Sequence, residues 1–181
     1  MGEVGRVSKD YRITIGDGRS TEVLVAAGDY GYAHSCVTSD NFPVRRPDTV
    51  LAREVVLLEF AQSVTSEEAV GEATRLGLER PIYEDALAFG AAYPAVQVER
   101  PVVFLHDPWF GFFGRRDVIS LWCNAGRREL GLEGFEGPWN TDWRFGFVRA
   151  LAERGARMTR AHPRFPGTMR ARCAIRKHST G

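Results

Sequence analysis

The sequence predicts an α+β fold with a mostly antiparallel sheet of about four to six strands, two to three helices and a basic C-terminal extension. Helix signals cluster early in the chain and strand signals late, which is typical of α+β rather than doubly wound α/β folds. Hydrophobic residues make up 44% of the 181 residues, enough for a chain of this length to form a buried core. An abrupt change of charge separates the extension from the rest.

The N-terminal part of the chain predicts one strand and one helix. Residues 11–15 alternate between apolar and polar side chains and predict a short strand. Ser20 suits the N-cap of a helix, because its hydroxyl can accept a hydrogen bond from a free backbone N–H. Gly28 suits the C-terminal end of this helix. A long loop over 29–48 is expected to follow.

A buried strand and a capped helix come next. Residues 53–60 (REVVLLEF) contain the apolar run of a buried strand. Thr65 and Glu68 have the spacing of a capping box, in which each side chain bonds to the other residue's backbone N–H. The pattern predicts a helix that begins at this box and ends at Gly77.

A further helix is predicted after Pro81. Proline suits the first turn of a helix, where its missing N–H is not needed. Glu84 and Asp85 would then lie in the first turn, where carboxylates interact favourably with the helix dipole. Pro94 is expected to end this helix.

Strand signals dominate the second half of the chain. Strands are predicted over residues 98–106, 117–123 and 143–149, with a short one over 128–132. In the last of the longer strands, aromatic residues at alternate positions should face one side of the sheet, because successive side chains point to opposite faces. The strands are close in sequence, so antiparallel pairing is expected.

The charge of the chain is divided unevenly. The net charge is +1, but residues 151–181 contain eight Arg or Lys and one acid (+7), whereas residues 1–150 contain 16 basic and 22 acidic residues (−6). We therefore expect a single domain over 1–150 and a basic extension over 151–181. Clustered cations with few acids are typical of contacts with nucleic acid or another anionic partner. The predicted contacts are Arg160, Arg164, Arg170, Arg172, Arg176 and Lys177.

The composition argues against several classes of protein. The apolar runs, such as those at 55–58 and 102–105, are far shorter than the roughly 20 residues that cross a bilayer. No apolar stretch in the first ten residues has the character of a signal peptide. The three cysteines are widely spaced and form no CxxC pair, which does not favour a zinc ribbon. We expect a cytoplasmic protein with no membrane contact, no bound metal and no cofactor.

Ten of the 20 aromatic residues lie between positions 109 and 147. Aromatic residues on strands are usually part of the core, which is the expectation for Trp122, Trp143, Phe145 and Phe147. The loop that contains four large rings around Gly111 is harder to bury. Its rings either fold over the sheet and close the core, or reach solvent and form a contact surface. The predicted ligand or partner contacts are Trp109, Phe110, Phe112, Phe113 and Trp139.

His106 and Asp107 end a predicted strand, a place where site residues are common. The ordinary pKa of histidine suits general-base chemistry near neutral pH. One alternative is therefore a hydrolase-like site of His106, Asp107 and either Cys123 or Cys36. A second is a two-His, two-Cys metal site that also includes His34. The structural alternative is a turn at Asp107 and a buried thiol at Cys123.

Three stretches of the sequence, 38–43 (TSDNFP), 66–69 (SEEA) and 143–149 (WRFGFVR), resemble a group of small uncharacterised bacterial proteins. The resemblance spans about residues 20–149 and implies no specific activity. The similar proteins end near the position of the charge break, which implies that the basic segment is an extension. Residues 137–149 are also similar to the last strands of C-type-lectin-like folds.

Taken together, these features predict a non-enzymatic binding or interaction module. The aromatic loop and the basic extension would contact a protein partner or a nucleic acid. The alternatives are the hydrolase-like enzyme with a His/Asp/Cys site, and a structural or assembly subunit whose aromatic rings pack against a second copy. The exposure of the rings and the surroundings of His106 distinguish these predictions.

Overall fold

One mixed sheet of eight strands forms the centre of the computed structural model, which describes residues 5–45 and 50–150. The strand order is β1-β3-β8-β4-β6-β7-β2, and β5 pairs with β6 beside this path. Most neighbours are antiparallel, whereas the β4–β8 and β2–β7 pairs are parallel. The strands are β1 (Arg6–Ile15), β2 (Tyr32–Ala33), β3 (Leu51–Glu59), β4 (Val102–Val103), β5 (Trp109–Phe110), β6 (Arg116–Asn124), β7 (Arg127–Gly134) and β8 (Arg144–Ala150).

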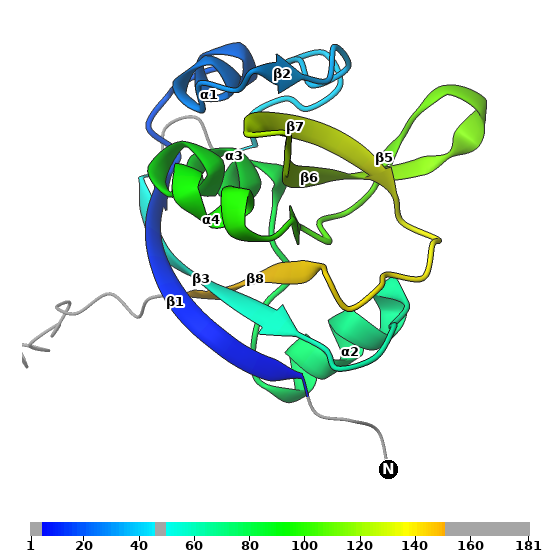
Figure 1. The fold of residues 1–181 in the computed structure, drawn as a ribbon. Coiled ribbons are helices and arrows are strands. Elements are labelled where there is room, and N and C mark those ends of the chain that lie inside the picture. Colours follow the sequence, from blue (N-terminus) through cyan, green and yellow to red (C-terminus); the bar gives the residue numbers. More distant parts are fainter. Residues whose placement is uncertain (1–4, 46–49, 151–181) are drawn as a thin grey trace, which may run out of the picture.

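Four α-helices within the described ranges cover the sheet. Helices α3 and α4 lie inside the curve between β1 and β7, and α2 lies on the other side of β3 and β8 (Figure 1). Helix α3 is buried from Tyr83 to Gly90, because small and apolar residues occupy most of its surface. The helices are α1 (Thr21–Ala27), α2 (Ser66–Arg75), α3 (Tyr83–Ala92) and α4 (Pro94–Glu99).

The alternation of side chains along β3 builds two apolar clusters, one on each face of the sheet. Val55 and Leu57 belong to the cluster that includes α3, whereas Val56 and Leu58 belong to the cluster that includes α2. All four side chains are fully buried. Burying one such aliphatic side chain stabilises the fold by about 1.5–3 kcal/mol, so this strand connects the two halves of the core.

Strand β8 confirms the alternation predicted for its aromatic residues. Phe145 and Phe147 lie in the cluster beside α2, and Val148 lies in the cluster beside α3. Gly146 allows β8 to pass close to Phe104, since a Cβ atom at this position would lie 2.5 Å from a ring carbon. A larger residue would therefore displace a fully buried ring.

The predicted capping box of α2 is present. The hydroxyl of Thr65 accepts a hydrogen bond from the Glu68 backbone N–H at 3.2 Å, and the Glu68 carboxylate accepts one from the Thr65 N–H at 2.7 Å. Two N–H groups of the first helical turn are satisfied in this way. The local sequence rule was sufficient here because both partners lie within four residues.

The predicted α+β class with a mostly antiparallel sheet is confirmed, but the number of elements is not. The sheet has eight strands rather than four to six, and the described ranges contain four α-helices rather than two to three. Strands β2, β4 and β5 have two residues each, too few to show alternation. Helix α3 ends at Ala92, before Pro94 as expected, but Pro94 also begins a further helix, α4, that was not predicted. The predicted strand over 98–106 is therefore reduced to Val102–Val103.

The predicted basic contacts lie outside the described residues and have no structural placement here. These are Arg160, Arg164, Arg170, Arg172, Arg176 and Lys177. In residues 5–45 and 50–150, no helix has both the length and the apolar character required to cross a membrane.

Candidate functional site

His106, a predicted catalytic residue, is enclosed in the core. Its ring lies edge-on to the rings of Phe42 and Tyr83, with centroid distances of 6.2 and 5.9 Å. Nε2 accepts a hydrogen bond from the Ile119 backbone N–H at 3.0 Å, and Nδ1 lies 2.7 Å from the Asp107 carbonyl oxygen. The neutral ring therefore carries its proton on Nδ1 and donates it to Asp107.

The surroundings of His106 engage both of the ring nitrogens that base chemistry would use. Burial lowers its pKa to about 4, so the ring is neutral near pH 7, and both nitrogens are occupied by main-chain groups. Cys123 lies four residues beyond Ile119 on β6, a separation of about 14 Å along an extended strand. Among the described residues, no three His, Cys, Asp or Glu side chains are placed to hold a metal ion. The structure therefore separates Cys123 from His106, and its described residues do not assemble the two-His, two-Cys metal site.

Asp107, the second residue of that predicted site, is an exposed ion-pairing group. Its carboxylate lies 3.2 Å from the Arg80 guanidinium and 3.7 Å from that of Arg45. Arg80 also donates to the Leu105 carbonyl at 2.6 Å. These contacts hold the chain where it leaves β4, and they fix the base of the aromatic loop that follows.

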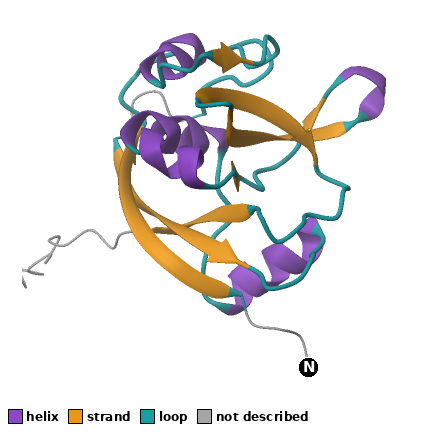
Figure 2. Cartoon of the chain, in the orientation of Figure 1, coloured by secondary structure: helices purple, strands orange, loops and turns teal. Residues whose placement is uncertain are grey.

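The aromatic loop folds as a short β-hairpin between β5 and β6. Trp109 is paired with Asp117, and Phe110 is paired with Arg116. Because paired residues share a face of the ladder, Trp109 and Asp117 lie on one side of the hairpin and Phe110 and Arg116 on the other. The hairpin extends away from the rest of the molecule (Figure 2).

The turn of the hairpin is closed by glycines and holds Phe113 at its tip. The Gly111 N–H donates to the Arg115 carbonyl at 2.8 Å, and the Gly114 N–H donates to the Gly111 carbonyl at 3.2 Å. Phe113 has a φ of 65°, in the left-handed region that bulky residues rarely adopt. Backbone strain of this kind clusters at functional sites, and here the strained residue is a phenylalanine with no place in the core.

The rings of the hairpin differ in their exposure. Phe110 is 69% exposed and Phe113 is fully exposed. Trp109 is half-buried and packs against Phe42 at a centroid distance of 5.7 Å. The side chain of Phe112 lies outside the described part of the structure. The alternative in which the loop closes the core does not apply to Phe110 and Phe113.

Trp139, the fifth predicted contact, is part of the core. Its Nε1–H donates to the Ser66 hydroxyl at 2.8 Å, and its ring lies edge-on to that of Trp143 at 5.0 Å. A bridge between Trp139 and Val64 ties its backbone to the segment before α2. With 5% of its surface exposed, Trp139 stabilises the interior and has no surface for a partner.

Two hollows flank Trp109, which forms the wall between them. The hollow on the side of Phe42 has a volume of about 320 Å³, and the one on the side of Asp117 has a volume of about 280 Å³. The first is lined by Asn41, Phe42, Arg45, Tyr83, Asp107, Pro108, Trp109 and Phe110. The second is lined by His34, Cys36, Trp109, Phe113, Arg115 and Asp117.

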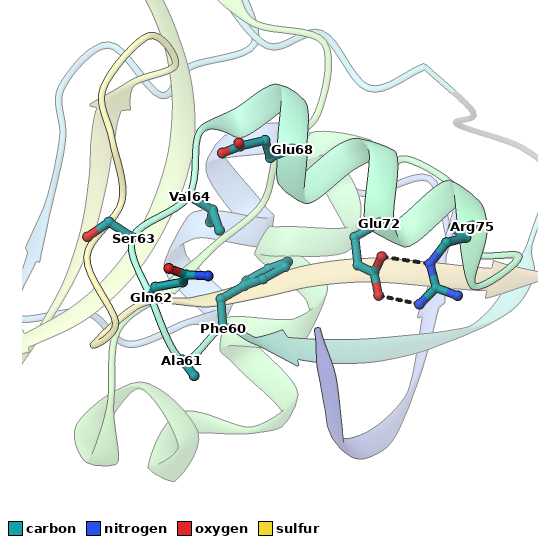
Figure 3. Close-up of a pocket in the computed structure, with 8 residues that line it drawn as sticks. All are labelled: Phe60, Ala61, Gln62, Ser63, Val64, Glu68, Glu72 and Arg75. Atoms are coloured by element: carbon teal, nitrogen blue, oxygen red, sulfur yellow. Dashed lines mark hydrogen bonds and ion pairs between the residues drawn. The ribbon is translucent and has the colours of Figure 1, made fainter. Parts of the chain in front are cut away.

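A larger hollow of about 540 Å³ lies between α2 and the loop that follows β3 (Figure 3). The charged side chains around it are engaged in the fold. Glu68 belongs to the capping box, and Glu72 binds the Arg75 guanidinium through two hydrogen bonds of 2.7 and 2.8 Å. Glu72 also accepts a hydrogen bond from the Gly5 N–H. This hollow therefore offers less for ligand recognition than the hairpin does.

The sequence did not predict the polar residues that lie beside Trp109 on the hairpin. Arg115 and Asp117 were not among the predicted contacts, although their two-residue spacing at the start of a strand places them on one face. His34 and Cys36 join them from a distant loop. Only the pairing of β5 with β6 shows that this face also carries Trp109.

No family model, curated protein or solved structure matches this chain. The hairpin geometry is therefore the basis for a functional proposal.

Proposed function

We propose that the protein is a non-enzymatic binding module that holds single-stranded nucleic acid. The aromatic hairpin, defined here as residues 109–115, stacks against bases, and the basic extension at 151–181 contacts phosphates. The observation that carries the proposal is the exposure of Phe110 and Phe113 on a hairpin whose base is anchored by Trp109.

Exposed rings are suited to contact with unpaired bases. The stacking of a base on an aromatic side chain stabilises complexes by about 1–3 kcal/mol and tolerates any sequence, because every base has a π face. The other large apolar residues exposed in the described ranges are Val7, Val23, Tyr32, Val50 and Val98. Exposed phenylalanine is thus concentrated on the hairpin among the residues whose side chains are described.

The charge division supports an anionic partner. Residues 151–181 carry +7, whereas residues 1–150 carry −6. The attraction of phosphates would therefore come mainly from the extension, and the hairpin would supply contacts that do not depend on charge. Affinity should fall steeply with salt, because cations that bind phosphates release condensed counterions.

The proposal is tested with the full chain and fluorescently labelled oligothymidine and oligouridine of about 20 nucleotides. Anisotropy titrations at roughly 50 and 200 mM salt give the affinity and its salt dependence. Replacing both Phe110 and Phe113 with alanine should weaken binding at least about tenfold, because two stacking contacts are lost. Val98→Ala is the matched control, since it removes an exposed apolar side chain from α4 and should leave the affinity unchanged.

Two results would reject the proposal. One is the absence of oligonucleotide binding at the lower salt concentration, and the other is equal binding by the wild-type chain and the double variant. If oligonucleotides do not bind and sedimentation shows a mass that rises with concentration and returns to that of a monomer in the double variant, the protein is an assembly subunit that uses the same rings.

A further inference from the structure

We infer that the hollow between Trp109, Phe113 and Asp117 is a phosphate subsite in which Arg115 binds the anion and Asp117 positions Arg115. This inference rests on the proposed function and adds the residues that hold the backbone beside the stacked bases.

Asp117 is a buried carboxylate that holds one cation. Its side chain is 4% exposed, and its Oδ1 lies 2.7 Å from Arg115 Nε. Within residues 5–45 and 50–150, the carboxylate accepts no other close ion pair. A buried charge of this kind is costly unless it is paired, so Asp117 favours an Arg115 conformation that keeps the guanidinium close to it, although Oδ1 has no hydrogen-bond partner among the described residues.

The ion pair with Asp117 leaves most of the Arg115 guanidinium open. A guanidinium carries five N–H donors in a planar fork, and the described residues supply no hydrogen-bond acceptor for its terminal amino groups. The side chain is 62% exposed, so these donors face solvent at the hollow. A phosphate oxygen pair matches such a fork, and the contact is charge-assisted.

The other walls of the hollow suit a nucleotide. Trp109 and Phe113 supply apolar ring surface beside the cation. The Cys36 N–H donates to Nδ1 of His34 at 3.2 Å, so a neutral His34 ring carries its proton on Nε2 and is a further donor. A cation beside two rings fits a phosphate whose attached sugar and base extend over apolar surface.

The geometry of this face leaves little freedom for the hairpin to rearrange. A Cβ atom at Gly111 would lie 2.8 Å from the Trp109 ring and 2.9 Å from Asp117 Oδ2. Glycine therefore allows the turn to lie directly over both residues. The ring and the carboxylate thus lie close against the turn before any ligand arrives, which lowers the entropic cost of binding.

Arg116 provides a matched control on the same strand. It is adjacent to Arg115 and has the same charge, but its side chain lies on the opposite face, where it is paired with Glu136 and stacked on Phe135 at 4.9 Å. Loss of either arginine changes the net charge equally, so a difference between the two variants reports on the hollow rather than on overall charge.

The experiment measures oligothymidine binding against salt for the wild-type chain, Arg115→Gln, Arg116→Gln and Asp117→Asn. Arg115→Gln should weaken binding roughly tenfold, as expected for a lost charged hydrogen bond. It should also reduce the slope of log K against log salt by about 0.7, the value for one phosphate contact in single strands. Arg116→Gln should have a clearly smaller effect on both quantities.

Asp117→Asn distinguishes two roles for Asp117, because positioning of Arg115 and simple charge repulsion predict opposite changes in oligonucleotide affinity. Removing a negative charge next to a phosphate should tighten binding if Asp117 acts only through its charge. Releasing Arg115 should instead weaken binding and reduce the salt slope. Circular dichroism and thermal denaturation confirm that each variant is folded, and thymidine monophosphate should compete better than thymidine in the wild type but not in Arg115→Gln.

The outcomes distinguish this inference from the proposed function. If oligonucleotides bind and the Phe110 and Phe113 variants lose affinity, but Arg115→Gln behaves as Arg116→Gln does, the subsite is rejected and the binding module stands. If no oligonucleotide binds, both are rejected. If polyglutamate displaces the oligonucleotide from the wild type but not from Arg115→Gln, the hollow takes carboxylates of an acidic peptide, which overturns the phosphate assignment.

Discussion

Two neighbouring stretches of the chain, residues 102–107 and the aromatic hairpin, both carry residue types common in functional sites, yet they have opposite environments. In the first, the apolar side chains are fully buried and His106 has both ring nitrogens hydrogen-bonded to the main chain. In the second, Phe110 and Phe113 face solvent and Arg115 keeps open donors. The comparison teaches that exposure and unmet hydrogen-bonding capacity, rather than residue type, separate the proposed binding surface from the core.

The largest expected effect comes from removing one ring from each stretch. Phe104→Ala should lower the free energy of unfolding by about 3–5 kcal/mol, because the ring is fully buried and packs against Phe89. Phe113→Ala should change it by less than about 0.5 kcal/mol. Urea denaturation of both variants measures the difference, and similar losses in the two variants would show that Phe113 also supports the core.

A smaller effect is expected from pH. Burial lowers the pKa of His106 to about 4, from about 6.5 in the unfolded chain. The unfolded chain therefore binds more protons between these values, and about 3 kcal/mol of stability is lost as the pH falls from 6.5 to 4. Asp85 has the opposite pH dependence. Burial raises its pKa to about 6, so its contribution to the free energy of unfolding is lost as the pH rises through that value.

Comparison with His106→Gln isolates the contribution of the histidine, since Asp85 is present in both proteins. The free energy of unfolding of the wild type should decrease more between pH 6.5 and pH 4.5 than that of the variant. Parallel curves would mean that His106 is more accessible to protons than its burial indicates, and the contrast between the two stretches would weaken.

The smallest effect is expected at the strained turn. Phe113→Asn should leave stability unchanged or raise it by up to about 1 kcal/mol, because asparagine tolerates the left-handed conformation better than phenylalanine does. The same variant should bind oligonucleotides more weakly. Phe113→Ala is the control that removes the ring without easing the backbone, and thermal denaturation should place it below Phe113→Asn. The reverse order would argue against strain at this residue.

Parts of the fold were predictable because they depend on local rules. The capping box of α2 and the alternation of Phe145 and Phe147 on β8 need only residues that are close in sequence. The extent of β4 was not predictable, because its pairing depends on β6 and β8, which come later in the chain. The start of α4 at Pro94 was missed because proline can end one helix and begin the next.

The candidate site shows the same limit. Four large rings at one loop identified the hairpin, but composition does not reveal which rings reach solvent. Asp85 was correctly placed at the start of a helix, where it accepts a hydrogen bond from the Ile82 N–H. Its burial was not predicted, because it depends on the Arg53 guanidinium at 3.0 Å, which β3 supplies from across the core.

The shortness of β4 has a consequence for how the protein opens. Among the described strands, the two-residue β4 links the β1-β3-β8 portion of the ladder to the β6-β7 portion, with one flanking backbone hydrogen bond on each side. We therefore expect the backbone amides of the two portions to differ in their protection from hydrogen exchange. Each portion would open as its own cooperative unit, while the side chains around α3 keep the two portions in contact. The hairpin belongs to the β6 unit, so slow opening of the opposite portion would leave the proposed binding surface intact.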